Sequence, residues 1–236
     1  MKKIHAIYVI ISIILMGIGI GGVFILPGNE REPKESVGEI IKLPEPRYDS
    51  ETSIEEALLK RRSIRTYKNE SLTIAEVSQL LWASQGITDL EMGFRTAPSA
   101  GALYPLEVYV VIGNVQGISK GVYKYNPYKH ELVKVKDGDV RDKLAIASLG
   151  QTWVRDGAIV IVFSAIYERT TEKYGDRGIR YVHMEVGHAA QNVYLQGVSL
   201  NLGTVVVGAF RDDRVREILN MSDKEHPLYI MPVGRI

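Results

Sequence analysis

The sequence predicts an α+β fold in which helices pack on a mixed β-sheet. Some segments combine helical apolar periodicity with N-terminal capping signals, whereas others are short apolar runs typical of strands. The two kinds do not alternate regularly, as they would in a parallel sheet built from strand–helix–strand units. About 190 residues follow a separable N-terminal part, which is enough for one domain with a sizeable core.

The first predicted helix of the body begins at a capping box. Ser53 and Glu56 have the Ser-x-x-Glu spacing, and Ile54, Ala57 and Leu58 then mark an apolar face that should turn inward. After this helix the chain becomes rich in β-branched and aromatic residues, which favour extended backbone.

A second capping box, Thr73 with Glu76, begins the next helix, which Gly86 ends. Its inward face carries Ile74, Val77, Leu80 and Leu81. The remaining predicted elements are a strand over 106–112, a hairpin of 122–125 and 132–135, a helix near 139–149, a buried strand over 158–163, a long helix over 177–200, a strand over 204–210, a short helix capped by Asp212 or Asp213, and a strand over 228–233.

The N-terminal 26 residues are expected to form a membrane anchor. Lys2 and Lys3 precede an uncharged run over 6–26, about the ~20 residues that cross a bilayer. A cleaved signal peptide is the alternative, but it has a shorter apolar core and a small-residue cleavage site. The cationic N-terminus predicts a cytoplasmic start and an extracytoplasmic body. Residues 27–46 are expected to be a linker, and 47–236 the folded domain.

Composition excludes several classes of function. The formal net charge is +1, from 29 basic and 28 acidic residues, which argues against a broad nucleic-acid interface. The chain has no cysteine, so disulfides, thiolate catalysis and cysteine metal ligation are ruled out. His183 and His188 are five residues apart and do not share a helix face as metal ligands at i and i+4 do, so no metal site is predicted.

A candidate phosphate site follows the first helix. Arg61, Ser63 and Arg65 alternate along an extended segment, so their side chains should share one face. Two guanidinium groups and a hydroxyl suit a phosphate dianion. The alternative is that these are solvated cations that favour a helix C-terminus.

A loop of small residues precedes the strand over 106–112. The segment 97–105 reads Ala-Pro-Ser-Ala-Gly-Ala-Leu-Tyr-Pro, and small residues between two prolines make a rigid loop with accessible backbone N–H groups. Such a loop lets a flat ligand approach the backbone closely. In the long helix, Gln191 and Asn192 are polar amides that need partners if they are buried.

Five motifs occur in an order that resembles the nitroreductase family. They are Arg-x-Ser-x-Arg at 61–65, Pro-Ser-Ala-Gly at 98–101, Gly-His-Ala-Ala-Gln-Asn at 187–192, Val-Val-Gly-Ala-Phe at 206–210 and Pro-Val-Gly-Arg at 232–235. The resemblance extends from about Ser53 to Ile236. Pro-Ser-Ala-Gly-Ala-Leu-Tyr-Pro and Lys-Tyr-Gly-Asp-Arg at 173–177 look most like the SagB-type branch, the azoline dehydrogenases of thiazole and oxazole peptide synthesis.

The resemblance implies a homodimeric flavoprotein, with a nitroreductase-like mixed sheet flanked by helices and FMN at the subunit interface. Residues implied to bind FMN are Arg61, Ser63 and Arg65 at the phosphate and ribityl chain, Pro98, Ser99, Ala100 and Gly101 from the partner subunit, Val207 and Gly208 at the ring edge, and Gln191 and Arg235. Lys173 and Tyr174 are the implied catalytic pair, which assists proton removal while hydride passes to flavin. The alternative for this pair is a solvated entry to a helix.

Two features depart from the family pattern. Many nitroreductases have an asparagine where Ala102 stands, and many carry a basic pair beyond the last strand, where this chain has only Arg235 near its end. The expected function is an FMN-dependent oxidoreductase that transfers hydride between flavin and a small organic or peptide substrate. The alternative is a non-catalytic, membrane-anchored flavin-binding or scaffold protein.

Overall fold

The computed structural model describes residues 38–236, and the structural statements below refer to these residues. The strands of the main sheet are β1 (Ile40–Lys42), β4 (Leu106–Ile112), β5 (Gly121–Asn126), β6 (Glu131–Asp137), β7 (Ile159–Ala165), β8 (Leu202–Thr204) and β9 (His226–Arg235). A separate hairpin consists of β2 (Ile87–Asp89) and β3 (Phe94–Arg95). The helices are α1 (Ile54–Lys60), α2 (Ile74–Gln85), α3 (Arg141–Ala147), α4 (Trp153–Asp156), α5 (Glu168–Tyr174), α6 (Arg177–Ser199) and α7 (Asp212–Leu219), with a 3-10 turn, η1 (Ala100–Ala102).

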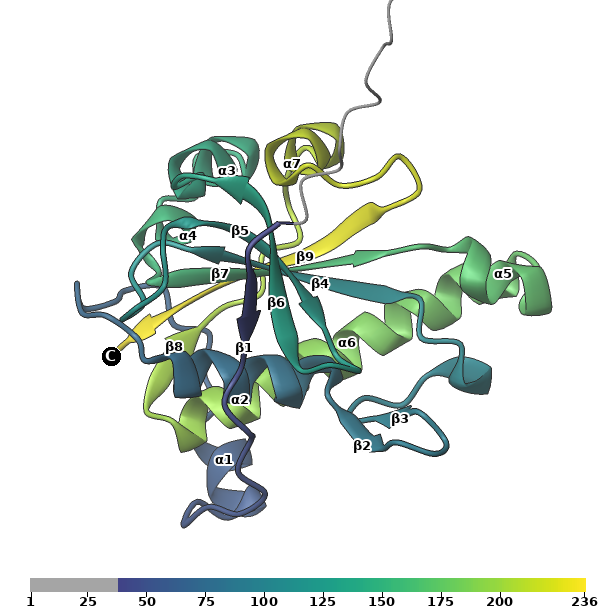
Figure 1. Cartoon of the computed structure of the whole chain (residues 1–236), viewed down its shortest axis with the longest axis horizontal. Helices are drawn as coiled ribbons and strands as arrows, with labels where there is room; N and C mark the ends of the chain where they lie inside the picture. The colour runs from purple at the N-terminus through teal and green to yellow at the C-terminus, as the bar shows by residue number, and fades with distance from the viewer. Residues whose placement is uncertain (1–37) are drawn as a thin grey trace, which may run out of the picture. The chain divides into compact units, whose positions relative to one another are not determined.

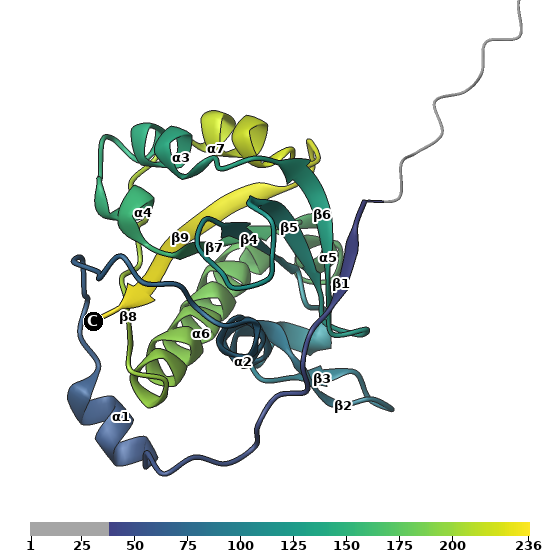
Figure 2. The same cartoon turned by 60° about the vertical axis from the view of Figure 1, so that its left-hand side comes forward.

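The main sheet is seven-stranded, in the order β1-β6-β5-β4-β7-β9-β8. The pairs between neighbouring strands are antiparallel, and within the described residues parallel contacts occur at two isolated bridges, Ser63 with Thr204 and Leu72 with Val115. Helices α2 and α6 cover one face of the sheet, and α3, α4 and α7 cover the other (Figures 1 and 2). The predicted α+β class, with helices packed on a sheet, is therefore confirmed, although the sheet is almost wholly antiparallel.

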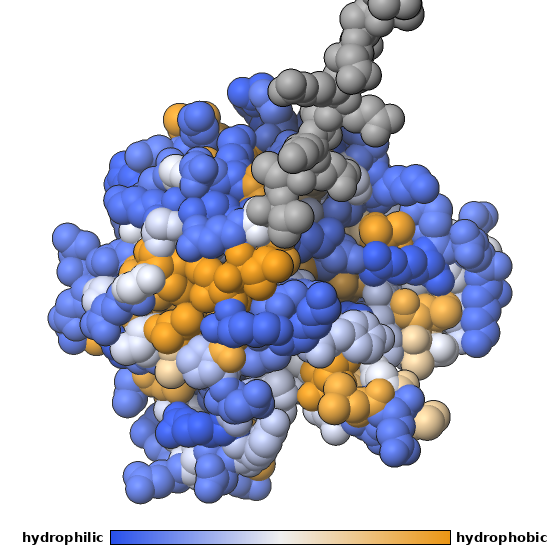
Figure 3. Space-filling model, in the orientation of Figure 1, coloured by the Kyte–Doolittle hydropathy of each residue, from blue (hydrophilic) through white to orange (hydrophobic). Residues whose placement is uncertain are grey.

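Each face of the sheet carries its own hydrophobic core. Along β4, Val108 and Val110 belong to the core under α2 and α6, whereas Tyr109 and Val111 belong to the core under α3, α4 and α7. This alternation follows from the two-residue period of a strand. The central strand β7 is buried along its whole length, as its continuous apolar sequence predicts. From the side seen in Figure 3, hydrophilic residues cover most of the surface and hydrophobic ones gather mainly in a band across the sheet.

The two capping boxes have different outcomes. At α2 the Thr73 N–H donates to Glu76 Oε2 at 2.8 Å and the Glu76 N–H donates to Thr73 Oγ1 at 3.3 Å, so the predicted box is complete. At α1 the Glu56 N–H donates to Ser53 Oγ at 3.1 Å, but the Glu56 carboxylate pairs with a lysine of its own helix.

The predicted inward face of α1 is wrong for two of its three residues. Ile54 is 56% exposed and Leu58 54% exposed, and Ala57 alone is buried in this helix. The neighbouring Leu59 is 73% exposed as well. A helical period indicates which side chains share a face, but it does not say whether this chain supplies the surface that covers them.

Three further expectations need correction. The predicted strand over 204–210 is replaced by β8, and Val207 makes only an isolated bridge with Ile230. Asp212 and Asp213 lie in the first turn of α7, whose N-cap is Arg211 without a side-chain cap. In addition, β1 lies within the range predicted as a linker and pairs with β6.

The expectation of a membrane-anchored, extracytoplasmic protein is also corrected. Within residues 38–236 no helix is both long enough and apolar enough to cross a bilayer. The segment 6–26, on which that expectation rested, lies outside the described residues.

Candidate active site

The segment that contains Ser63 lies against the C-terminal half of α6. The Ser63 Oγ is 3.1 Å from the Tyr194 Oη, and Ser63 forms its parallel bridge with Thr204. The Arg61 guanidinium lies over the Tyr194 ring, with 5.2 Å between its Cζ and the ring centroid. Arg61 and Ser63 therefore converge on one tyrosine, whereas Arg65, the third residue predicted on the same face, does not join them.

The other basic residues near this segment point to different partners. The Arg65 Cζ lies 5.5 Å from the centroid of the Trp153 ring on α4. Arg62 turns back toward α1, because its Nη1 donates to the Leu59 carbonyl at 2.9 Å. Arg235 forms a two-pronged ion pair with Glu76, at 2.6 and 2.9 Å. Since that guanidinium is already paired, the structure gives no support to a phosphate-binding role for Arg235.

The loop after β3 has an unusual backbone. Gly101 has φ +64°, and two non-glycine residues, Ala102 and Tyr104, also have positive φ, of 53° and 46°. Positive φ costs an L-residue roughly 1–2 kcal/mol, so the surrounding structure must hold this loop in place. The Ser99 Oγ contributes by accepting the Tyr104 N–H at 2.9 Å.

This loop meets the Lys-Tyr pair at the end of α5. A Cβ on Gly101 would lie 2.7 Å from the Tyr174 Oη and 3.0 Å from the Lys173 Nζ. The backbone of the loop therefore lies against the ends of both side chains, closer than a residue with a Cβ would allow unless those ends moved. Tyr174 in turn packs edge-on against Tyr181 of α6, with 5.2 Å between ring centroids. The structure thus brings together residues that are more than 70 positions apart in the sequence.

A buried carboxyl group lies on α6, beside the same loop. Glu185 is 3% exposed, and its Oε1 has no hydrogen-bond partner among the described residues. Burial raises the pKa of Glu185 to about 7, although a hydrogen bond from Ser99 and the charge of Arg95 oppose that rise. An acid whose pKa lies near neutrality is suited to hold or release a proton under ordinary conditions.

The remaining predicted site residues are less closely grouped. Pro98 is exposed and Ala100 half-buried on the loop, and Gln191 is half-buried on α6. The Val207 N–H donates a hydrogen bond to the Ile230 carbonyl at 2.8 Å. The backbone of Gly208, by contrast, is exposed.

The two groups of candidate residues contact opposite halves of α6. Tyr181 contacts the Lys-Tyr pair and Tyr194 contacts Ser63, and the 13 residues between them correspond to about 20 Å of helix. Within a single chain, the candidate phosphate site and the Gly101 loop therefore lie well apart.

Two members of this site were missed in the sequence. Tyr194 gives no signal there, because a tyrosine in an amphipathic helix is usually a packing residue. Its Oη nevertheless accepts the Val206 N–H at 2.8 Å as well as contacting Ser63. Glu185 did offer a signal, since it is an acid between Met184 and Val186, in a helix with many apolar and small residues.

Comparison with known proteins agrees with this fold. The model of the nitroreductase family matches residues 58–235. A Methanocaldococcus jannaschii protein, provisionally named a nitroreductase, is 55% identical over 185 residues, which are 78% of this chain and 92% of that protein. A solved structure provisionally named a nitroreductase from Anabaena variabilis has a TM-score of 0.74 and 34% identity, and the match covers 84% of this chain and 42% of that one.

More distant relatives have established names. The microcin B17-processing protein McbC of Escherichia coli is 29% identical over 172 residues, which are 70% of this chain and 63% of McbC. A Bacillus subtilis protein named FMN reductase (NADPH) is 22% identical over 193 residues, 76% of this chain and 64% of that protein. Nitroreductase-family enzymes are oxidoreductases that typically bind flavin. The family model matches most of this chain, so the chain belongs to the nitroreductase family.

Proposed function

We propose that this protein is an FMN-dependent oxidoreductase of the SagB type, which transfers hydride between flavin and a small organic or peptide substrate. The observation that carries the proposal is the close approach of the Gly101 backbone to Lys173 and Tyr174. The relation to McbC, which is named for processing microcin B17, supports the SagB-type assignment.

The donor set of the segment 61–65 fits the phosphate of FMN. Beside Tyr194, Arg61 supplies a guanidinium group and the exposed Ser63 supplies a hydroxyl. Arg65, which lies against Trp153 in this chain, supplies a second guanidinium group when its exposed side chain turns toward them. Charge-assisted hydrogen bonds from such groups are strong and directional toward a phosphate dianion. The Gly101 loop fits a flat ring system, because it presents backbone and small side chains in place of bulky ones.

The residues of the chain have separate tasks in this proposal. FMN, when bound, supplies the acceptor for a hydride and therefore for two electrons. Lys173 and Tyr174 take up the proton that leaves the substrate together with that hydride, so the substrate loses two hydrogens and gains a double bond. Glu185 lies beneath the loop and holds a proton near neutral pH. The alternative of a bound but non-catalytic flavin predicts that Lys173→Ala changes no turnover.

A homodimer joins the two halves of the site. The open face of α6 includes Met184, which is 52% exposed, and Gly187, above which a Cβ would meet nothing within 4 Å. A second copy packed on this face in the antiparallel sense would place the Tyr194 end of one α6 beside the Tyr181 end of the other. It would also cover apolar side chains of α1 that this chain leaves exposed, such as Leu59.

The flavin proposal is tested by the absorption spectrum and FMN affinity of the full chain. Arg61→Ala and Arg65→Ala should each weaken FMN binding by about tenfold or more. Arg62→Ala is the matched control, because this arginine hydrogen-bonds back to α1, and it should bind FMN as the wild type does. A colourless protein that takes up no added FMN would refute the proposal.

The dimer proposal is tested by light scattering. Met184→Lys should yield monomers, because it places a charge in the proposed interface. Ile146→Lys is the control, since Ile146 is 73% exposed and lies on α3, on the opposite face of the sheet. Equal molecular masses for the two variants would contradict an interface on α6.

A further inference from the structure

A cavity lies where the main sheet opens between β4 and β5. The two strands pair only from Tyr109 opposite Lys124 to Ile112 opposite Gly121. Beyond that point residues 106–108 continue to pair with β7 alone, and Tyr125 pairs with β6 alone. The cavity occupies this opening and has a volume of about 630 Å³, within the range typical of small-molecule sites. We call it the wedge cavity.

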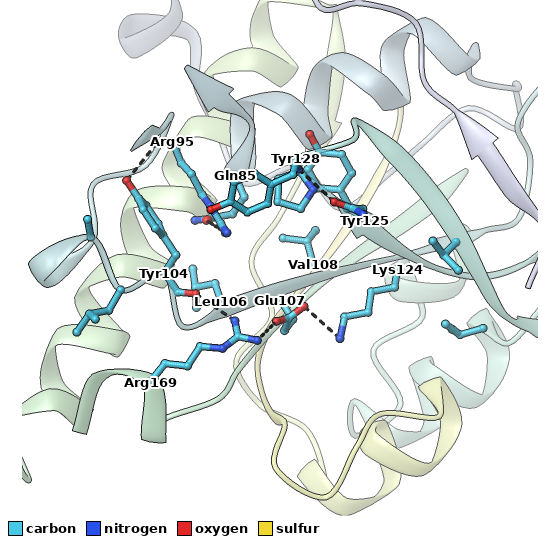
Figure 4. Close-up of a pocket in the computed structure, with 16 residues that line it drawn as sticks. Gln85, Arg95, Tyr104, Leu106, Glu107, Val108, Lys124, Tyr125, Tyr128 and Arg169 are labelled. Carbon is cyan, nitrogen blue, oxygen red and sulfur yellow. Dashed lines mark hydrogen bonds and ion pairs between the residues drawn. The ribbon is translucent and has the colours of Figure 1, made fainter. Parts of the chain in front are cut away.

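One wall of the wedge cavity combines a guanidinium group with aromatic rings (Figure 4). The Arg95 Cζ lies 4.5 Å from the centroid of the Tyr104 ring and 5.7 Å from that of Tyr128. Arg95 Nη1 donates to Gln85 Oε1 at 2.9 Å. The guanidinium is therefore held in a fixed orientation between aromatic groups, and its side-chain hydrogen-bond partner there is a neutral amide. Glu185 is near enough for the charge of Arg95 to lower its pKa, but burial raises that pKa to about 7, so this carboxyl neutralises Arg95 only in part near neutral pH.

The other cations of the wedge cavity are already neutralised. The Glu107 carboxylate forms ion pairs with Arg169 at 2.5 Å and with Lys124 at 3.1 Å (Figure 4). Lys124 also pairs with the buried Glu225 at 3.1 Å. Among the cations that line the wedge cavity, Arg95 is thus the one that forms no ion pair with a carboxylate of the described residues.

The Arg95 wall also contains unsatisfied polar groups. Arg95 Nε and Gln85 Nε2 are both buried and have no hydrogen-bond partner among the described residues. Gln85 is only 1% exposed and lines the wedge cavity. Buried donors without acceptors are rare in native proteins, and a bound water or ligand is one explanation for them.

We propose that the wedge cavity binds an organic carboxylate with an aromatic or similarly planar body. The carboxylate pairs with the free edge of Arg95, and the planar body packs on Tyr104, Tyr128 and the apolar floor at Val108. The wedge cavity and the Lys-Tyr pair lie on different sides of the same loop, since Gly101 approaches Tyr174 whereas Tyr104 lines the wedge cavity. Binding here therefore does not rest on the proposed flavin chemistry.

The test is calorimetric titration of the full chain with 2-naphthoate, with its neutral analogue 2-naphthamide as the ligand control. Saturable binding of the carboxylate below about 1 mM is expected, with the amide at least tenfold weaker. Arg95→Gln should weaken the binding of 2-naphthoate by tenfold or more. Arg214→Gln is the matched control, because Arg214 is exposed on α7 in a surface ion pair, and it should leave binding unchanged.

Other outcomes would overturn the proposal. These are no saturable binding, equal affinity for carboxylate and amide, or an Arg95→Gln variant that binds as the wild type does. If Arg95→Gln fails to fold, Tyr128→Leu replaces it, since Tyr128 is 58% exposed and is not needed for the core. Tyr128→Leu should weaken the binding of 2-naphthoate severalfold, and an unchanged affinity would overturn the proposed site. Titrations with and without added FMN should agree, which keeps this result separate from the flavin assignment.

Discussion

Replacing Gly101 by alanine tests whether the close approach of its backbone to the Lys-Tyr pair serves catalysis. The added Cβ would lie 2.7 Å from the Tyr174 Oη, and ordinary contact begins at 3.4 Å, so the hydroxyl has to retreat by about 0.7 Å. A misplacement of about 1 Å can cost about 100-fold in rate. We expect kcat to fall about tenfold to 100-fold.

The same substitution has a separate cost in stability. An alanine at φ +64° is less favourable than glycine by about 1–2 kcal/mol. For a domain of this size, each kcal/mol lowers Tm by about 2–4 °C. Gly117→Ala isolates this cost, because Gly117 has φ +75° and a Cβ there would meet nothing within 4 Å.

The assay compares the two variants by thermal unfolding and by NADPH oxidation with menadione as acceptor, using FMN-loaded protein. Both variants should lose similar stability, whereas only Gly101→Ala should lose turnover. If Gly101→Ala keeps the kcat of Gly117→Ala, the approach of this loop to Tyr174 has no role in this turnover, and the expectation of a tenfold to 100-fold loss is refuted.

Three further predictions concern charged groups. Glu225→Ala should lower the free energy of unfolding by about 3 kcal/mol in urea denaturation, because Glu225 is 3% exposed and its loss removes a buried partner of Lys124; a loss below 1 kcal/mol would contradict this. Burial raises the pKa of Glu185 from 4.5 to about 7, so the native state binds more protons between these values and stability should fall as pH rises through that window. Glu185→Gln should flatten this dependence of stability on pH, which is followed by measuring the free energy of unfolding at pH 5 and at pH 8. The same slope in the variant and the wild type would refute the assignment to Glu185. Arg235→Ala should lower the free energy of unfolding by about 2 kcal/mol, because it removes the ion pair with Glu76. It should weaken FMN binding less than Arg65→Ala does. The reverse order of FMN affinities would restore Arg235 to the phosphate site.

The fold was predictable wherever local pattern and long-range packing agree. The helix α2 is capped by Thr73 and ends before Gly86, as its capping box and terminal glycine predict, because those signals act within a few residues. The buried strand β7 was predictable from its apolar run alone. The exposed face of α1 was not, because amphipathic spacing is the same whether another segment or another molecule covers the helix.

The candidate site was only partly predictable. Arg61 and Ser63 could be grouped because they are close in sequence, and extended backbone places them on one side. Tyr194 could not be added, since it reaches Ser63 across 131 positions through the packing of α6. The contact between Gly101 and Tyr174 likewise depends on positive φ in a loop, which small residues permit but do not specify.

The short strand β1 has a consequence for how the protein avoids aggregation. Strand β6 is seven residues long, and β1 covers only its first part, from Glu131 to Val133. The Lys134 N–H still donates to the Glu39 carbonyl, and the part of β6 beyond it, left at the sheet edge, carries Lys136. A lysine on an edge discourages pairing with another chain. Deleting the residues before Leu43 would expose all of β6 and offer a longer unpaired edge to neighbouring molecules. A few residues that contribute little to the hydrophobic core would thereby determine whether the edge of the sheet can pair with another molecule.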